Sequence, residues 1–128
     1  MSRDKPKILI ADDEKDFVQS LLERLEYEGF EIVVAYEGIR AVETAHKQKP
    51  DLILLDLQMP AGTGQSVLKT LRNHPETSKI PVIVMTALRK AGLEEEMMDL
   101  GAFNFIQKPL DLGRLLASIR ALIGSKGM

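Results

Sequence analysis

Five short apolar segments recur at fairly even spacing along the chain, and this pattern constrains the fold more than any other feature. They are Ile8–Ala11, Ile32–Ala35, Leu52–Leu55, Val82–Met85 and Phe103–Ile106. Each has the length of a β-strand, and three of them (ILIA, LILL and VIVM) are apolar at successive rather than alternating positions. Such runs are typical of strands covered on both faces in a parallel sheet, although a buried helical segment can show the same pattern.

Between these runs, apolar residues recur at helical spacing, as at Phe17, Leu21 and Leu25 and again at Leu115 and Ile119. Glycines follow the periodic segments as expected helix ends, at Gly29, Gly101 and Gly124, and Asp111 is placed to cap the last helix. Alternating strands and helices predict an α/β fold, a doubly wound parallel sheet with helices on both faces. Periodicity alone leaves the strand order open.

Length and composition exclude several classes of function. A chain of 128 residues has the size of one domain, which we expect to span 1–128 with a core at about 7–123. The 17 basic and 19 acidic residues alternate, so direct nucleic-acid binding by this chain is not expected. No cysteine is present, which excludes thiol chemistry, and no apolar run is long enough for a bilayer. We expect a soluble, cytoplasmic protein with no membrane contact.

Polar residues follow four of the five apolar runs. Asp12 and Asp13 follow the first, Asp56 the third, Thr86 the fourth and Lys108 the fifth. Each has an ordinary structural explanation taken singly, as a helix cap, a turn residue, a strand end or a solvated charge. In an open parallel sheet, however, the carboxyl ends of the strands form the ligand-binding edge, so these side chains are expected to share one crevice.

Such a crevice would need added positive charge. Three clustered carboxylates repel one another, and a divalent cation together with Lys108 would balance them. All-oxygen ligation with room for water and a phosphate favours Mg²⁺. A carboxylate can attack phosphorus, which makes Asp56 the candidate nucleophile. The phosphoryl oxygens would then contact Mg²⁺, Lys108 and the Thr86 hydroxyl.

The segments ILIADDE, LILLDLQMPAGTG, VIVMTAL and FIQKPLD together resemble the receiver domains of response regulators in two-component signalling. The resemblance extends from about Lys7 to Ile123. It implies a flavodoxin-like fold with five parallel strands in the order 2-1-3-4-5, with the first and third strands adjacent.

The resemblance also implies roles for individual residues. Asp12 and Asp13 would hold Mg²⁺ together with Asp56 and the backbone carbonyl of Gln58. Asp56 would be the phosphoacceptor. Thr86 and Lys108 would sense the phosphoryl group.

Two further residues are implicated by the resemblance. Phe105 stands at the position of an aromatic switch residue, although an ordinary core-edge aromatic is a fair alternative. The Lys108–Pro109 bond is expected to be cis, which is uncommon for an arbitrary X-Pro bond.

The expected function is the acceptance of a phosphoryl group from a sensor histidine kinase or a histidine phosphotransfer protein, with no enzymatic activity beyond the chain's own phosphorylation and dephosphorylation. The response would appear on the surface of the fourth helix, fifth strand and fifth helix, where a homodimer could form.

One alternative is a degenerate receiver that only binds partners or dimerises. Another is an enzyme of the same architecture, but no G-x-G-x-x-G follows the first strand and no Walker pattern occurs.

Overall fold

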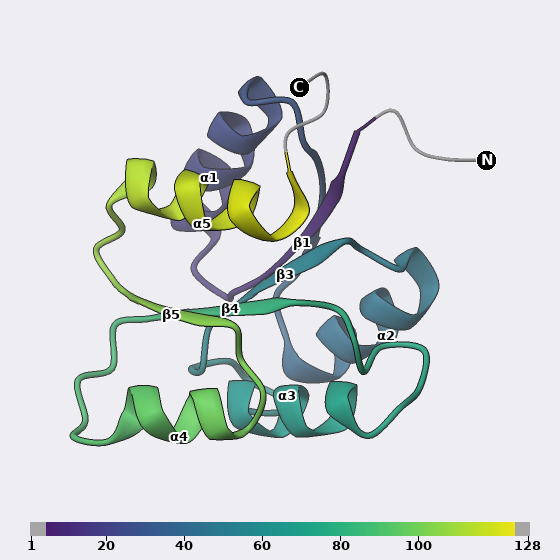
Figure 1. The fold of residues 1–128 in the computed structure, drawn as a ribbon, viewed down its shortest axis with the longest axis vertical. Helices are drawn as coiled ribbons and strands as arrows, with labels where there is room; N and C mark the ends of the chain where they lie inside the picture. The colour runs from purple at the N-terminus through teal and green to yellow at the C-terminus, as the bar shows by residue number, and fades with distance from the viewer. Residues whose placement is uncertain (1–4, 125–128) are drawn as a thin grey trace.

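The computed structural model describes residues 5–124, which alternate between strands and helices (Figure 1). The strands are β1 (Lys7–Ala11), β2 (Glu31–Ala35), β3 (Leu52–Leu55), β4 (Val82–Thr86) and β5 (Asn104–Gln107). The helices are α1 (Lys15–Tyr27), α2 (Gly38–Gln48), α3 (Gly64–Arg72), α4 (Leu93–Asp99) and α5 (Leu112–Ile123). All strand pairs are parallel, and their order is β2-β1-β3-β4-β5. This confirms the expected doubly wound, flavodoxin-like fold.

The last strand begins one residue later than its apolar run suggested. Asn104 pairs with Ile83 in the β4–β5 register, whereas Phe103 precedes the strand and has a side chain that is 54% exposed. The Phe103 N–H still donates to the Val82 carbonyl, at 2.8 Å. At its other end, β5 stops at Gln107, immediately before Lys108.

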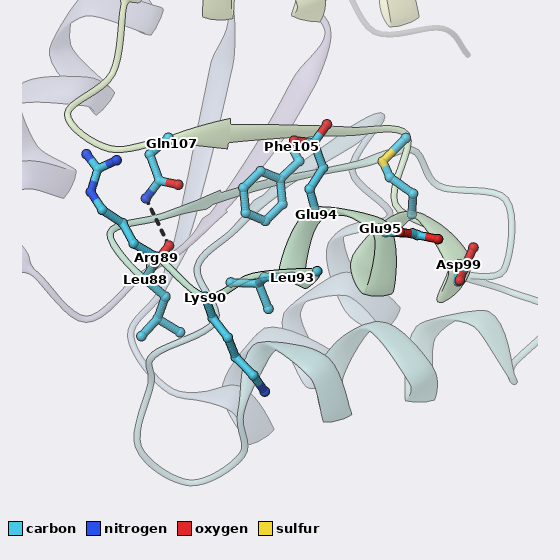
Figure 2. Close-up of a pocket in the computed structure, with 11 residues that line it drawn as sticks. Leu88, Arg89, Lys90, Leu93, Glu94, Glu95, Asp99, Phe105 and Gln107 are labelled. Atoms are coloured by element: carbon cyan, nitrogen blue, oxygen red, sulfur yellow. Dashed lines mark hydrogen bonds between the residues drawn. The ribbon is translucent and has the colours of Figure 1, made fainter.

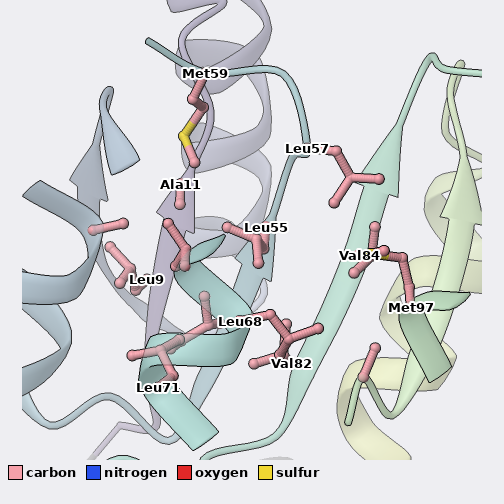
Figure 3. Close-up of a cluster of buried hydrophobic side chains, with 14 of the residues drawn as sticks. Leu9, Ala11, Leu55, Leu57, Met59, Leu68, Leu71, Val82, Val84 and Met97 are labelled. Atoms are coloured by element: carbon pink, nitrogen blue, oxygen red, sulfur yellow. The ribbon is translucent and has the colours of Figure 1, made fainter. Parts of the chain in front are cut away.

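Two apolar layers enclose the sheet because its strand residues alternate between the two faces. On one face, Ile8, Ile10 and their counterparts in the other central strands pack against α1 and α5. On the other face, Leu9, Leu55 and Val84 pack against α2, α3 and α4, as Figure 3 shows for part of this cluster. The central strands β1, β3 and β4 are thus buried on both sides, which explains their continuous apolar sequences.

A close backbone contact holds the turn between β3 and α3 against the start of α2. Gly38 donates its N–H to the Pro60 carbonyl at 3.0 Å, and Ile39 donates to the Ala61 carbonyl at 2.8 Å. A Cβ atom on Gly38 would lie 2.2 Å from the Gly62 carbonyl oxygen, so only glycine fits there. Ala61 adopts a left-handed φ of 54° in the same turn. The turn that follows Asp56 is therefore fixed by main-chain contacts.

Within residues 5–124, none of the helices combines the length and the apolar character needed to cross a bilayer.

Candidate phosphoryl-acceptor site

Adjacent strands bring two carboxylates together at the carboxyl edge of the sheet. Ala11 pairs with Leu55 in the β1–β3 register, so Asp12 and Asp56 follow the two strands side by side. Both are buried, and the Asp56 N–H donates to the Ala11 carbonyl at 2.9 Å. Asp12 Oδ1 accepts the Glu14 N–H at 2.9 Å, and Asp56 Oδ1 accepts the Leu57 N–H at 2.7 Å. These main-chain bonds fix the orientation of each carboxylate.

The Lys108 ammonium links these carboxylates from across the sheet. Its Nζ donates to Asp12 Oδ2 at 2.7 Å, to Glu14 Oε1 at 2.7 Å and to Asp56 Oδ2 at 3.2 Å. The same nitrogen lies 4.1 Å from the centroid of the Phe17 ring. With three carboxylate acceptors, the ammonium has used all of its donors, and Phe17 covers its remaining side.

Asp13 adds a further carboxylate on the solvent side. Its side chain is exposed, and one carboxylate oxygen from each of Asp12, Asp13 and Asp56 lies within 4.8 Å of the others. Lys108 contacts Asp12, Glu14 and Asp56, and Asp13 adds a fourth carboxylate beside them, so negative charge is in excess of the one ammonium. A compact group of carboxylate oxygens, partly open to water, suits Mg²⁺, which prefers oxygen ligands and retains some of its waters.

Burial and charge act in opposite directions on the groups in this cluster. Burial raises the pKa of the Asp12 carboxyl, and the charge of Asp56 adds to this effect, although hydrogen bonds from Lys108 and the Glu14 N–H partly oppose it. Burial alone would lower the pKa of Lys108, but hydrogen bonds to Asp12 and Glu14 and the nearby negative charges raise it above its usual range. The lysine therefore remains charged, whereas burial, with a smaller effect from Asp56, makes the Asp12 carboxyl harder to ionise.

Thr86 ends β4 beside this cluster and is completely buried. Its hydroxyl accepts the Leu88 N–H at 3.2 Å, and its carbonyl accepts the Lys108 N–H at 2.8 Å. Because a hydroxyl can accept and donate at the same time, this bond leaves the Thr86 proton available for a further acceptor.

The remaining residues singled out in the sequence lie around the same edge. The Lys108–Pro109 peptide bond is cis. Gln58 is exposed, and its N–H lies 3.3 Å from Asp56 Oδ1. Phe105 is 9% exposed and packs in the cluster beneath α4. Figure 2 shows its ring between β5 and α4, where it lines a groove of about 670 Å³.

Sequence reasoning missed two residues of this site. Glu14 follows the acidic pair and binds Lys108 although its side chain is 60% exposed, and Phe17 had been assigned only to the apolar stripe of its helix. The third acidic letter of ILIADDE was a visible signal for Glu14. No comparable signal marked Phe17, because its contact with Lys108 depends on how α1 packs.

Comparison with known proteins agrees with this geometry. Residues 8–120 match the family described as the response regulator receiver domain. Over 118 residues the chain is 36% identical to the "DNA-binding dual master transcriptional regulator RpaA" of Synechocystis sp., an alignment that covers 92% of this chain and 49% of RpaA. It is 32% identical over 117 residues to the "Polar-differentiation response regulator DivK" of Brucella anthropi, covering 91% of this chain and 95% of DivK.

A solved structure shows the same likeness. The signal receiver domain of "DNA binding response regulator protein (merR)" from Colwellia psychrerythraea 34H has 32% identity and a TM-score of 0.86, with 93% of this chain and 98% of that chain covered. The chain spans about half the length, or less, of several curated relatives that it matches. The strand order, the acidic edge and the match over residues 8–120 lead to one conclusion: this chain belongs to the response regulator receiver domain family of two-component signalling.

Proposed function

We propose that this receiver domain accepts a phosphoryl group on Asp56. The observation that carries the proposal is the contact of the Lys108 ammonium with both buried carboxylates, in a cluster whose negative charge exceeds what one lysine can balance. The donor is a phosphohistidine of a sensor histidine kinase or of a histidine phosphotransfer protein, the partners with which receiver domains of response regulators interact.

The transfer breaks one bond and forms another. An Asp56 carboxylate oxygen attacks phosphorus, the P–N bond to the donor imidazole breaks, and the electron pair of that bond leaves with the imidazole nitrogen. Oδ2 is the reactive oxygen, since Oδ1 is occupied by the Leu57 and Gln58 N–H groups. In taking the phosphoryl group, Asp56 would release Lys108 to a phosphoryl oxygen. The chain thus assists its own modification without turning over an external substrate.

Residues that would hold Mg²⁺ are Asp12, Asp13 and Asp56 through carboxylates and Gln58 through its backbone carbonyl. When bound, the ion supplies positive charge to the carboxylates and to the phosphoryl oxygens. The donor set fits this ion because the cluster contains only oxygen ligands and has an open, solvent-facing side at Asp13. The Thr86 hydroxyl and the Lys108 ammonium would bind the other phosphoryl oxygens.

The proposed response involves Thr86 and Phe105. Movement of Thr86 toward the phosphoryl group would vacate space for Phe105, which borders the groove beside α4, and would alter the α4-β5-α5 surface. We propose this surface as the place where partners, including a second copy of the domain, sense the phosphorylated state. A domain spanning residues 1–128 would then act as one switch.

The test is incubation with phosphoramidate or acetyl phosphate and Mg²⁺, followed by intact mass measurement. We expect wild type to gain one phosphoryl group, and expect no gain for Asp56→Asn or for wild type in EDTA. An unmodified wild-type protein under these conditions would instead support a binding module that is never phosphorylated. A mass gain that persists in Asp56→Asn would place the acceptor elsewhere.

A further inference from the structure

The side chain of Gln107 connects the end of β5 to the turn that follows β4. Its Nε2 donates to the Thr86 carbonyl at 2.8 Å and to the Leu88 carbonyl at 2.9 Å, the latter visible as the dashed line in Figure 2. Both amide hydrogens are therefore used on main-chain acceptors of one turn. Gln107 is half-buried, so these bonds are only partly exposed to competition from water.

The same turn is held at each of its peptide groups. The Leu88 N–H donates to the Thr86 hydroxyl at 3.2 Å, while the Leu88 carbonyl accepts from Gln107. The Thr86 carbonyl accepts from Gln107 and also from the Lys108 N–H, at 2.8 Å. Arg89 adds a longer bond of 3.3 Å to the Lys108 carbonyl. The end of β4 and the residues around Lys108 thus form one hydrogen-bonded unit.

We propose that Gln107 is a positioning residue, which holds Thr86 and Lys108 in a fixed relation so that both meet the phosphoryl group together. This role rests on the proposed phosphoryl transfer to Asp56. Gln107 touches neither Asp56 nor the cluster of carboxylates and acts through the backbone of its neighbours. Without its amide, the Leu88 carbonyl loses its partner, and the position of the Thr86 hydroxyl depends on one weaker bond from the Leu88 N–H.

The test uses Gln107→Met, which keeps the length of the side chain and removes both donors. Gln19→Met, on the exposed face of α1, is the matched control for the change of residue type. Hydrogen exchange at the Leu88 amide is measured first in unphosphorylated protein without Mg²⁺. We expect exchange in Gln107→Met to rise about fivefold, the effect of losing one net hydrogen bond, and expect no change in the control. Gln107→Lys, which restores donors at similar length, should return exchange toward wild type.

Phosphoryl uptake from phosphoramidate is then followed by intact mass. We expect Gln107→Met to take up the group about two- to fivefold more slowly than wild type and Gln19→Met, the scale of one hydrogen bond's loss. Unchanged Leu88 exchange, or faster exchange with a wild-type uptake rate, would overturn the role of Gln107. A wild type that takes up no phosphoryl group would refute the proposed function itself, and that result is read from the wild-type sample alone.

Discussion

Two cations, the buried Lys108 and the half-buried Arg72, lie at opposite ends of the sheet and have contrasting partners. Lys108, at the carboxyl edge, contacts three carboxylates. Arg72, the last residue of α3, lies near the amino ends of β4 and β5, and its guanidinium donates to the Gly101 carbonyl at 2.9 and 3.2 Å. It also donates to the carbonyls of Ser78, at 3.2 Å, and Ile80, at 2.9 Å.

The difference supports a structural role for Arg72 and is consistent with the role in phosphoryl transfer proposed for Lys108. Arg72 is surrounded by neutral dipoles that join the end of α3 to two loops, and burial lowers its pKa. Four of its five N–H donors are used on these carbonyls. Around Lys108 the carboxylates outnumber the cation, so the cluster could hold a further positive charge such as a metal ion. We expect substitutions at the two ends to respond differently to Mg²⁺.

The largest effect on stability is expected at Arg72, near the amino ends of β4 and β5. Arg72→Met keeps the apolar stem but removes the donors to three buried or half-buried carbonyls, and we expect it to lower the free energy of unfolding by about 2–3 kcal/mol. Urea unfolding followed by circular dichroism gives this value. The loss should be the same in EDTA and in Mg²⁺, since no carboxylate is involved.

Arg72→Lys is the matched control for charge. A single ammonium cannot reproduce the planar geometry of the guanidinium, so we expect it to recover only part of the lost stability. Full recovery would mean that the positive charge, and not the set of carbonyl contacts, stabilises this end.

At the carboxyl edge we expect a substitution to raise, and not lower, the free energy of unfolding. Asp56→Asn removes one negative charge while its carbonyl oxygen can still accept the Leu57 N–H, and Lys108 keeps its two shorter bonds. In EDTA the variant should be more stable than wild type by about 1 kcal/mol, because repulsion among the clustered carboxylates is reduced. Mg²⁺ should stabilise wild type more than the variant. A variant that is less stable than wild type in EDTA would contradict the charge imbalance.

The sequence predicted which residues lie at the carboxyl edge of the sheet better than it predicted the contacts among them. Runs such as LILL required burial on both faces, and Asp56 had to follow one of them, so its place was predictable from the alternation of elements. The bridge from Lys108 to Glu14 was not, because it joins residues 94 positions apart across the sheet. The strand order came from family resemblance and not from the apolar pattern.

Side-chain direction was the other limit. On α4, Met97 is fully buried whereas Met98 is 41% exposed, a difference that residue type alone does not predict, because adjacent helical residues point in different directions. The glutamine at 107 carried no periodic signal either. Its double contact with the turn after β4 exists only in the register that pairs Thr86 with Gln107.

The smallest effect concerns a second charged group away from the site, where Glu28 meets two arginines. Glu28 accepts from Arg120 at 2.7 Å and from Arg24 at 3.0 Å, and these hydrogen bonds lower its pKa. A carboxyl whose pKa is lowered by folding stabilises the folded state at pH values above its pKa in the unfolded state. This contribution disappears as the pH falls through its pKa in the folded state. We therefore expect Glu28→Gln to be slightly less stable than wild type at neutral pH, and the difference to shrink as pH falls below the usual glutamate pKa of about 4.3 and to vanish only below the lowered pKa of the folded state. Urea unfolding of both proteins across this range measures the difference. Since Glu28 is paired with two arginines and not crowded by other carboxylates, Mg²⁺ should leave the stability difference between the two proteins unchanged. A difference that depends on Mg²⁺ would show that Glu28 is coupled to the acidic edge.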